Sequence, residues 1–199
     1  MSSYLALYTV SDSNLAILRK NPRFIHRLLN PDIAPAMEHA VVAAGGEVPG
    51  FWSILFSPVK QARAKLAPPV FQPPEGAVLD LDRAWPGLHF LLSGAVPDFL
   101  AGGGSPLGEA ADGLFVFSAD ETRAIAHGVG RMDREALLRL YLPARMRELQ
   151  VGPQDRWEEG SDAETLEGDF AWLYEYFELL QAFLTEAAAN GLGLVKELS

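Results

Sequence analysis

The C-terminal stretch "LEGDFAWLYEYFELLQAFLTEAAANGLGLVKEL" (residues 166–198) decides the fold. Its apolar residues recur every three or four positions, which predicts one long helix from about Asp162 to Asn190. The apolar residues form two stripes, so we expect this helix to be packed on both sides. The glycines that follow end the helix, and "LVKEL" can return as a strand. The stripes are Leu166, Phe170, Leu173, Phe177, Leu180 and Leu184, and Trp172, Tyr176, Leu179 and Phe183.

Two uncharged apolar segments upstream predict further buried strands, "YLALYTV" (4–10) and "LFVF" (114–117). Short helices follow both segments. The first helix begins after "SDSN", whose side chains can accept free N–H groups, and the second at "SADE" (118–121), a capping box. Strands separated by helices predict a helix-rich α/β protein with a small mixed sheet flanked by helices.

The composition excludes several kinds of chemistry. The chain has 199 residues and no cysteine, so disulfides, thiolate nucleophiles, cysteine-type zinc sites and iron–sulfur clusters are ruled out. The first residues do not resemble a signal peptide, and no apolar run approaches the roughly 20 residues of a membrane span. We therefore expect a cytoplasmic protein that does not enter a membrane.

Charge is spread unevenly over the chain, which has a formal net charge of −10. Residues 1–66 carry seven Lys and Arg against four Asp and Glu, and residues 67–146 carry six against ten. Residues 147–199 carry three against twelve. An acidic C-terminal quarter repels nucleic acids and anionic membranes, so neither is expected as a partner, whereas a basic protein would be attracted. The alternative is a solvated surface that aids solubility.

The segment "LDLDRAWPGLHFLLSG" (79–94) holds the candidate catalytic residues Asp82, His89 and Ser93. On one helix Asp82 and His89 would be about 10 Å apart, so another segment must complete any acid–base pair. Ser93 lies one turn from His89, a spacing that allows nucleophile activation. The alternative is that His89 bonds a carbonyl group and Ser93 caps the helix end.

The tryptophan in the same segment, Trp85, is one turn from His89 and could stack on it. Pro86 is incompatible with a helix interior, so we expect the helix to begin near Arg83–Trp85. The glycine-rich "AGGGSPLGEA" (101–110) lacks the ending of a phosphate-binding loop and predicts a flexible turn. No histidine has a ligand-like neighbour at helical spacing, so no metal and no cofactor are expected.

A second candidate site is acidic and lies before the long helix. Asp155, Glu158 and Glu159 flank Trp157, and together they could form a docking edge for a basic protein. The alternative is a solvated helix start, where the dipole favours negative charge.

Several segments together resemble the YfbM-like family, a set of bacterial proteins grouped under a domain of unknown function. The resemblance covers about residues 78–199 and implies a three-layer α/β sandwich, but it implies no activity. We expect one domain over residues 1–199, with 31–77 as an insertion. The matching segments are "DLDRAWPGLHFLLSG", "SPLGEA", "LFVFSADETRAIAHGVGRMDREALLRLYLPARM" and "WLYEYFELLQAFLTEAAANGLGLVKELS".

Three functions are compatible with these features. The first is a non-catalytic binding protein with an acidic C-terminal surface, of which an immunity-like protein that neutralises a basic toxin is one version. The second is an enzyme or small-molecule binder whose cleft is lined by Asp82, Trp85, His89 and Ser93, together with the loop Gly102–Pro106. The third is a homo-oligomer that uses the aromatic cluster at 51–56, since the sequence does not determine the oligomeric state.

Overall fold

The computed structural model describes residues 4–22, 25, 77–107, 113–153, 156–157 and 163–198. The predicted insertion at 31–77, except for Ala77, and the aromatic cluster at 51–56 lie outside these residues. The helices are α1 (Asp12–Lys20), α5 (Trp85–Leu92), α6 (Ala119–Gly130), α7 (Arg134–Leu140), α8 (Pro143–Glu148) and α9 (Ala163–Ala189), with a 3-10 turn, η2 (Asp82–Ala84), before α5. The strands are β1 (Leu5–Val10), β2 (Val78–Asp80), β3 (Ser105–Pro106), β4 (Leu114–Phe117) and β5 (Gly193–Leu198).

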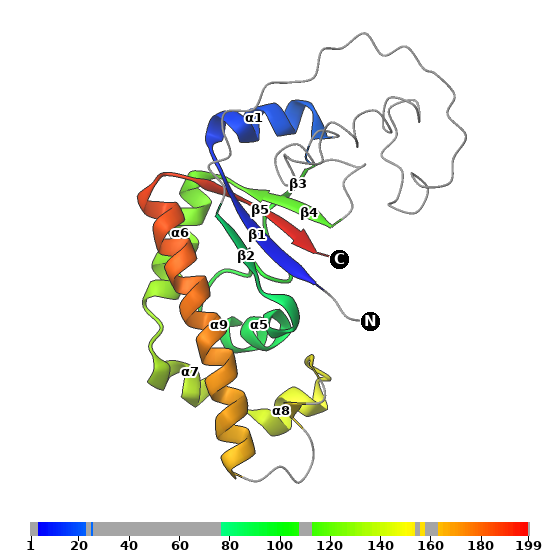
Figure 1. The fold of residues 1–199 in the computed structure, drawn as a ribbon, viewed down its shortest axis with the longest axis vertical. Coiled ribbons are helices and arrows are strands. Elements are labelled where there is room, and N and C mark those ends of the chain that lie inside the picture. The colour runs from blue at the N-terminus through cyan, green and yellow to red at the C-terminus, as the bar shows by residue number, and fades with distance from the viewer. Residues whose placement is uncertain are drawn as a thin grey trace, which may run out of the picture.

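The five strands form one open sheet in the order β2-β1-β5-β4-β3 (Figure 1). The first and last described strands, β1 and β5, pair along their full length at its centre, with Leu7 opposite Lys196. Each neighbouring pair is antiparallel, so the prediction of a mixed sheet is wrong in this respect. The helix-rich α/β class is confirmed.

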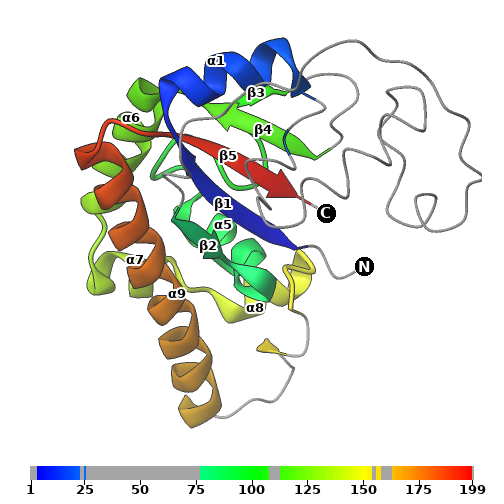
Figure 2. The same ribbon diagram turned by 45° about the horizontal axis from the view of Figure 1, so that its top comes forward.

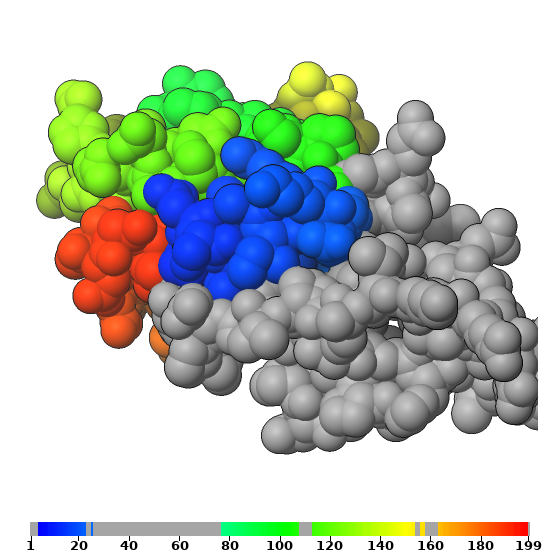
Figure 3. Space-filling view, turned by 90° about the horizontal axis from the view of Figure 1, so that it is seen from above, coloured from blue at the N-terminus to red at the C-terminus, as the bar shows by residue number. Residues whose placement is uncertain are grey.

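Helices cover both faces of the sheet, which confirms the three-layer arrangement (Figure 2). On one face α1 is the outer layer, and its atoms lie uppermost when that side is viewed from above (Figure 3). Its Leu15 and Leu18 pack against Val10, Val116 and Val195. Helices α5, α6 and α9 cover the other face and bury the larger core.

Local signals account for most element boundaries. Ser118 and Glu121 form the predicted capping box at the start of α6, and Asp133 caps α7. The strands predicted in 4–10, in 114–117 and after the long helix are confirmed. Two short edge strands, β2 and β3, were not predicted, because two or three residues carry too little periodicity to indicate a strand.

The long helix α9 is packed on one side only. Its first apolar stripe is buried from Phe170 to Leu184 against α6, α5 and β2, and Leu166 is half-buried. In the second stripe Phe183 is buried, but Leu179 is 55% exposed. The prediction that both stripes are covered is therefore wrong at Leu179, because the elements that contact α9, which include α6, α5 and β2, leave this side chain uncovered. None of the described helices combines the length and apolar character needed to cross a membrane.

Candidate functional site

The candidate catalytic segment folds as a 3-10 turn followed by the short helix α5. Pro86 occupies the first turn of α5, where its missing N–H costs nothing, so the helix begins at Trp85 as predicted. Asp82 opens the 3-10 turn with a positive φ of 39°, and its backbone N–H donates to the carboxylate of Asp80 at 2.7 Å. Asp82 thus belongs to the turn before α5 and has no recorded contact with His89.

Ser93 forms the C-terminal cap of α5, as the structural alternative predicted. Its hydroxyl donates to the carbonyl oxygen of His89 at 2.7 Å, and its backbone N–H donates to the same oxygen. Because the Ser93 hydroxyl proton is bonded to the backbone and not to the imidazole, this geometry does not activate Ser93 as a nucleophile.

His89 instead faces a carboxylate from the loop after α5. Its Nδ1 atom is 3.5 Å from Oδ1 of Asp98, and the two side chains are 34% and 49% exposed. The helix spacing predicted that any carboxylate partner of His89 must come from another segment. The loop after α5 supplies that carboxylate. Asp98 was not predicted, because one aspartate in an irregular loop carries no spacing signal.

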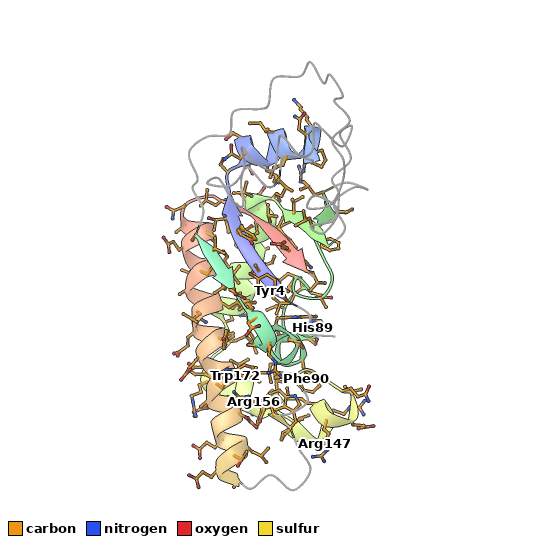
Figure 4. The ribbon with its side chains drawn as sticks, turned by 45° about the vertical axis from the view of Figure 1, so that its right-hand side comes forward. Tyr4, His89, Phe90, Arg147, Arg156 and Trp172 are labelled. Carbon is orange, nitrogen blue, oxygen red and sulfur yellow. The ribbon has the colours of Figure 1, made fainter. Side chains whose placement is uncertain are left out.

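The two side chains line an open hollow of about 160 Å³ at the end of α5. Figure 4 shows His89 well separated from Arg156 and Trp172. Most of the wall is apolar or backbone, with His89, Ser93 and Asp98 as the polar side chains. The lining residues are His89, Leu92, Ser93, Gly94, Val96, Pro97, Asp98, Phe99 and Leu100.

Asp98 also shapes the loop that carries it. Its carboxylate oxygens accept the N–H groups of Ala101 at 3.2 Å and Gly102 at 2.9 Å. Gly103 then turns the chain with a φ of +68°, and a Cβ at this position would collide with the backbone oxygen of Asp98. The first residues of the predicted flexible turn, 101–103, are therefore part of a tight loop with its own hydrogen bonds, and residues 108–110 lie outside the described part of the chain.

The loop is attached to the sheet by a buried lysine, Lys196 of β5. Its Nζ donates to the carbonyl oxygens of Phe99 at 3.1 Å, Leu100 at 3.2 Å and Gly102 at 2.6 Å. These bonds use all three donors of the ammonium group. The side chain is 0% exposed, and Nζ lies 4.6 Å from the centre of the Phe115 ring.

The buried position of Lys196 makes folding stability depend on pH. Burial lowers the pKa of Lys196 from 10.5 to about 8, and the nearby Asp98 opposes this change. The unfolded state therefore binds more protons between these values, so stability rises from about pH 8 toward pH 10.5 and is lost as the pH falls through 8. Denaturant unfolding of the wild type and of Lys196→Met should show a gap in stability that widens over this range. A gap that stays constant with pH would contradict this assignment.

The acidic candidate site is described only in part. Asp155, Glu158 and Glu159 lie outside the described residues. Trp157 is 0% exposed, its indole N–H donates to the carbonyl oxygen of Val151 at 2.9 Å, and its ring meets Tyr141 edge-on. The expectation that Trp157 contacts a partner is therefore corrected, because the side chain is a core residue.

An ion pair lies beside Trp157. Arg156 binds the buried carboxylate of Asp169 at 3.0 Å and stacks on Trp172 at 4.4 Å (Figure 4). In the part of the chain that is described, no three His, Asp or Glu side chains gather where they could hold a metal ion.

These features define the class of protein. It is a helix-rich α/β sandwich with a His–Asp pair in a small hollow and a long helix, α9, whose exposed side is acidic. The chain belongs to the family described as "Domain of unknown function (DUF1877)", which matches residues 1–196. Its fold is similar to the crystal structure of YfbM from Escherichia coli, a protein of unknown function. The two share 17% sequence identity with a TM-score of 0.55, and the match covers 97% of each chain. No curated protein matches the sequence.

Proposed function

We propose that this protein binds a basic protein partner through the exposed side of α9. We define the acidic face of α9 as five glutamates whose successive spacings are three or eight residues, so that they share one side of the helix. They are Glu164, Glu167, Glu175, Glu178 and Glu186.

The charge of this helix is the observation that carries the proposal. Its residues 163–189 include six acidic side chains and no Lys or Arg. Five of the six are exposed, and the sixth, Asp169, is buried and paired with Arg156. A helix surface with charges of one sign attracts partners of the opposite charge and accelerates their association.

An apolar residue at the border of the acidic face supports the same function. Leu179 is 55% exposed between Glu175 and Glu186, and Ala171 and Ala182 are exposed on the same side. Small and apolar side chains allow a partner to approach closely, while the glutamates around them supply charge. A basic toxin, as for an immunity-like protein, would be one such partner.

Neutralising the acidic face should abolish partner binding with little change in stability. We expect Glu175→Gln, Glu178→Gln and Glu186→Gln together to change the unfolding free energy by less than about 0.5 kcal/mol, because the three side chains are exposed. Affinity capture from cells of the source organism at about 0.05 M and about 0.5 M salt, with partner identification, measures the effect. The partner should be retained by the wild type at low salt only, and not by the triple variant.

The matched control removes the same charge elsewhere. Asp120→Asn, Glu135→Gln and Glu148→Gln change exposed carboxylates on α6, α7 and α8, each part of a surface ion pair worth little. This control should retain the partner. If both triple variants lose the partner equally, net charge is responsible and the acidic face is not the binding surface.

A second candidate function is small-molecule binding in the hollow at the end of α5. The observation that favours it is the convergence of His89 and Asp98 from two segments on one open space. A partly exposed His–Asp pair of this kind adds at most about 1 kcal/mol to stability.

This second function predicts that His89→Ala weakens ligand binding and leaves the thermal midpoint almost unchanged. Thermal unfolding and ligand titration of the same preparation would test it. If His89→Ala instead lowers stability by about 1–3 kcal/mol, the histidine is a structural residue.

A further inference from the structure

We propose that the hollow at the end of α5 binds a primary ammonium group on a short apolar chain, with Asp98 and His89 as its acceptors. This inference rests on the second proposed function, small-molecule binding in the hollow, and names the class of ligand. The ammonium could belong to a free amine or to a lysine side chain of another protein.

The spacing of the two polar side chains supports this ligand. Nδ1 of His89 and Oδ1 of Asp98 are 3.5 Å apart, and no hydrogen bond between them is among those of the described residues. With the proton on Nε2, a neutral imidazole presents Nδ1 as an acceptor, and the carboxylate presents another. One ammonium group, with three donors, can bind two acceptors this close together.

The surrounding charges favour a cation at this position. The carboxylate of Asp98 keeps its remaining lone pairs for the hollow, because its hydrogen bonds within the described residues come from two backbone N–H groups. Lys196 is near enough to interact electrostatically with Asp98, but it forms no hydrogen bond to this carboxylate, since its three Nζ donors go to carbonyl oxygens. The C-terminus of α5, at Leu92 and Ser93, adds the negative end of a helix dipole.

The size and walls of the hollow fit a short hydrocarbon chain. Its volume is about 160 Å³, close to the roughly 150 Å³ cavity that admits benzene. A chain of about four carbons with its nitrogen is of the size that such a space admits. Apolar wall residues would contact that chain; they are Leu92, Val96, Pro97, Phe99 and Leu100.

The test is to titrate the full chain with n-butylammonium and, separately, with Nα-acetyl-lysine methylamide. The amide chemical shifts of the protein report binding. The uncharged n-butanol has a similar shape and serves as the ligand control. We expect n-butylammonium to shift the amides of the hollow and to bind at least about tenfold more tightly than n-butanol, since a charge-assisted hydrogen bond is involved. Equal binding of the lysine derivative would show that a lysine side chain is also accepted.

Variants locate the acceptor. Asp98→Asn should weaken n-butylammonium binding about tenfold, whereas Asp120→Asn, an exposed residue of α6, should leave it unchanged. If Asp98→Asn does not fold, His89→Ala, which removes one of the two acceptors, should weaken binding several-fold.

The outcomes separate this inference from the function on which it rests. If n-butanol binds as tightly as n-butylammonium, or if Asp98→Asn has no effect, the hollow binds small molecules but the ammonium assignment is wrong. If neither n-butylammonium nor n-butanol nor the lysine derivative binds, both the ammonium assignment and small-molecule binding by short-chain ligands are overturned.

Discussion

Replacing Lys196 with methionine will destabilise the protein by about 3 kcal/mol, because two buried carbonyl oxygens and one partly buried carbonyl oxygen lose their shared donor. Those oxygens belong to Phe99, Leu100 and Gly102. The gain from no longer burying a charge offsets only part of this loss. Urea unfolding at pH 7 measures the effect, and for a chain of this size the thermal midpoint should fall by roughly 6–12 °C.

The arginine variant is the control for charge alone. Lys196→Arg keeps the positive charge, but a planar guanidinium cannot direct three donors toward carbonyl groups arranged around one nitrogen. It should therefore be destabilised as well. A loss below about 1 kcal/mol in the methionine variant would mean that the lysine does not hold the loop. The hollow also depends on this attachment, since Phe99 and Leu100 form part of its wall.

The sequence predicted the layers of the fold better than the strand directions. Periodicity and caps identify an element from residues close together in the chain, which is why β1, β4, α6 and α9 were found. Whether neighbouring strands run parallel depends on which of them pair, and pairing is decided by contacts between distant segments. Here the two ends of the chain meet as β1 and β5, and no local pattern indicates this.

Of the candidate site, the sequence predicted only the part that lies on helix α5. The segment 79–94 was identified as a helix with His89 on it, and the spacing showed that Asp82 could not reach the imidazole. Asp98 and Lys196, which complete the site, lie in a loop and in a strand. From its residue type alone, a lysine is expected at the surface even inside a short apolar strand. Only the fold shows that Lys196 is buried against three carbonyl groups.

The second large effect is expected at Trp157, where sequence and structure predict different results. If this residue contacted a partner, its removal would weaken binding and leave stability nearly unchanged. In the structure its ring is fully buried beside Tyr141, and its N–H bonds the carbonyl oxygen of Val151. Trp157→Ala should therefore cost about 3–5 kcal/mol, through lost apolar burial and the cavity that remains.

Two variants make this prediction specific. Trp157→Phe keeps most of the ring volume and loses the hydrogen bond, so it should cost about 1–2 kcal/mol. Trp172→Ala removes a tryptophan that is only partly buried under Arg156, and its cost should be clearly smaller than that of Trp157→Ala. Denaturant unfolding of the three variants gives this order directly. If Trp157→Ala were the least destabilised of the three, the side chain would have to lie at the surface, and the segment before α9 would again be a candidate for partner binding.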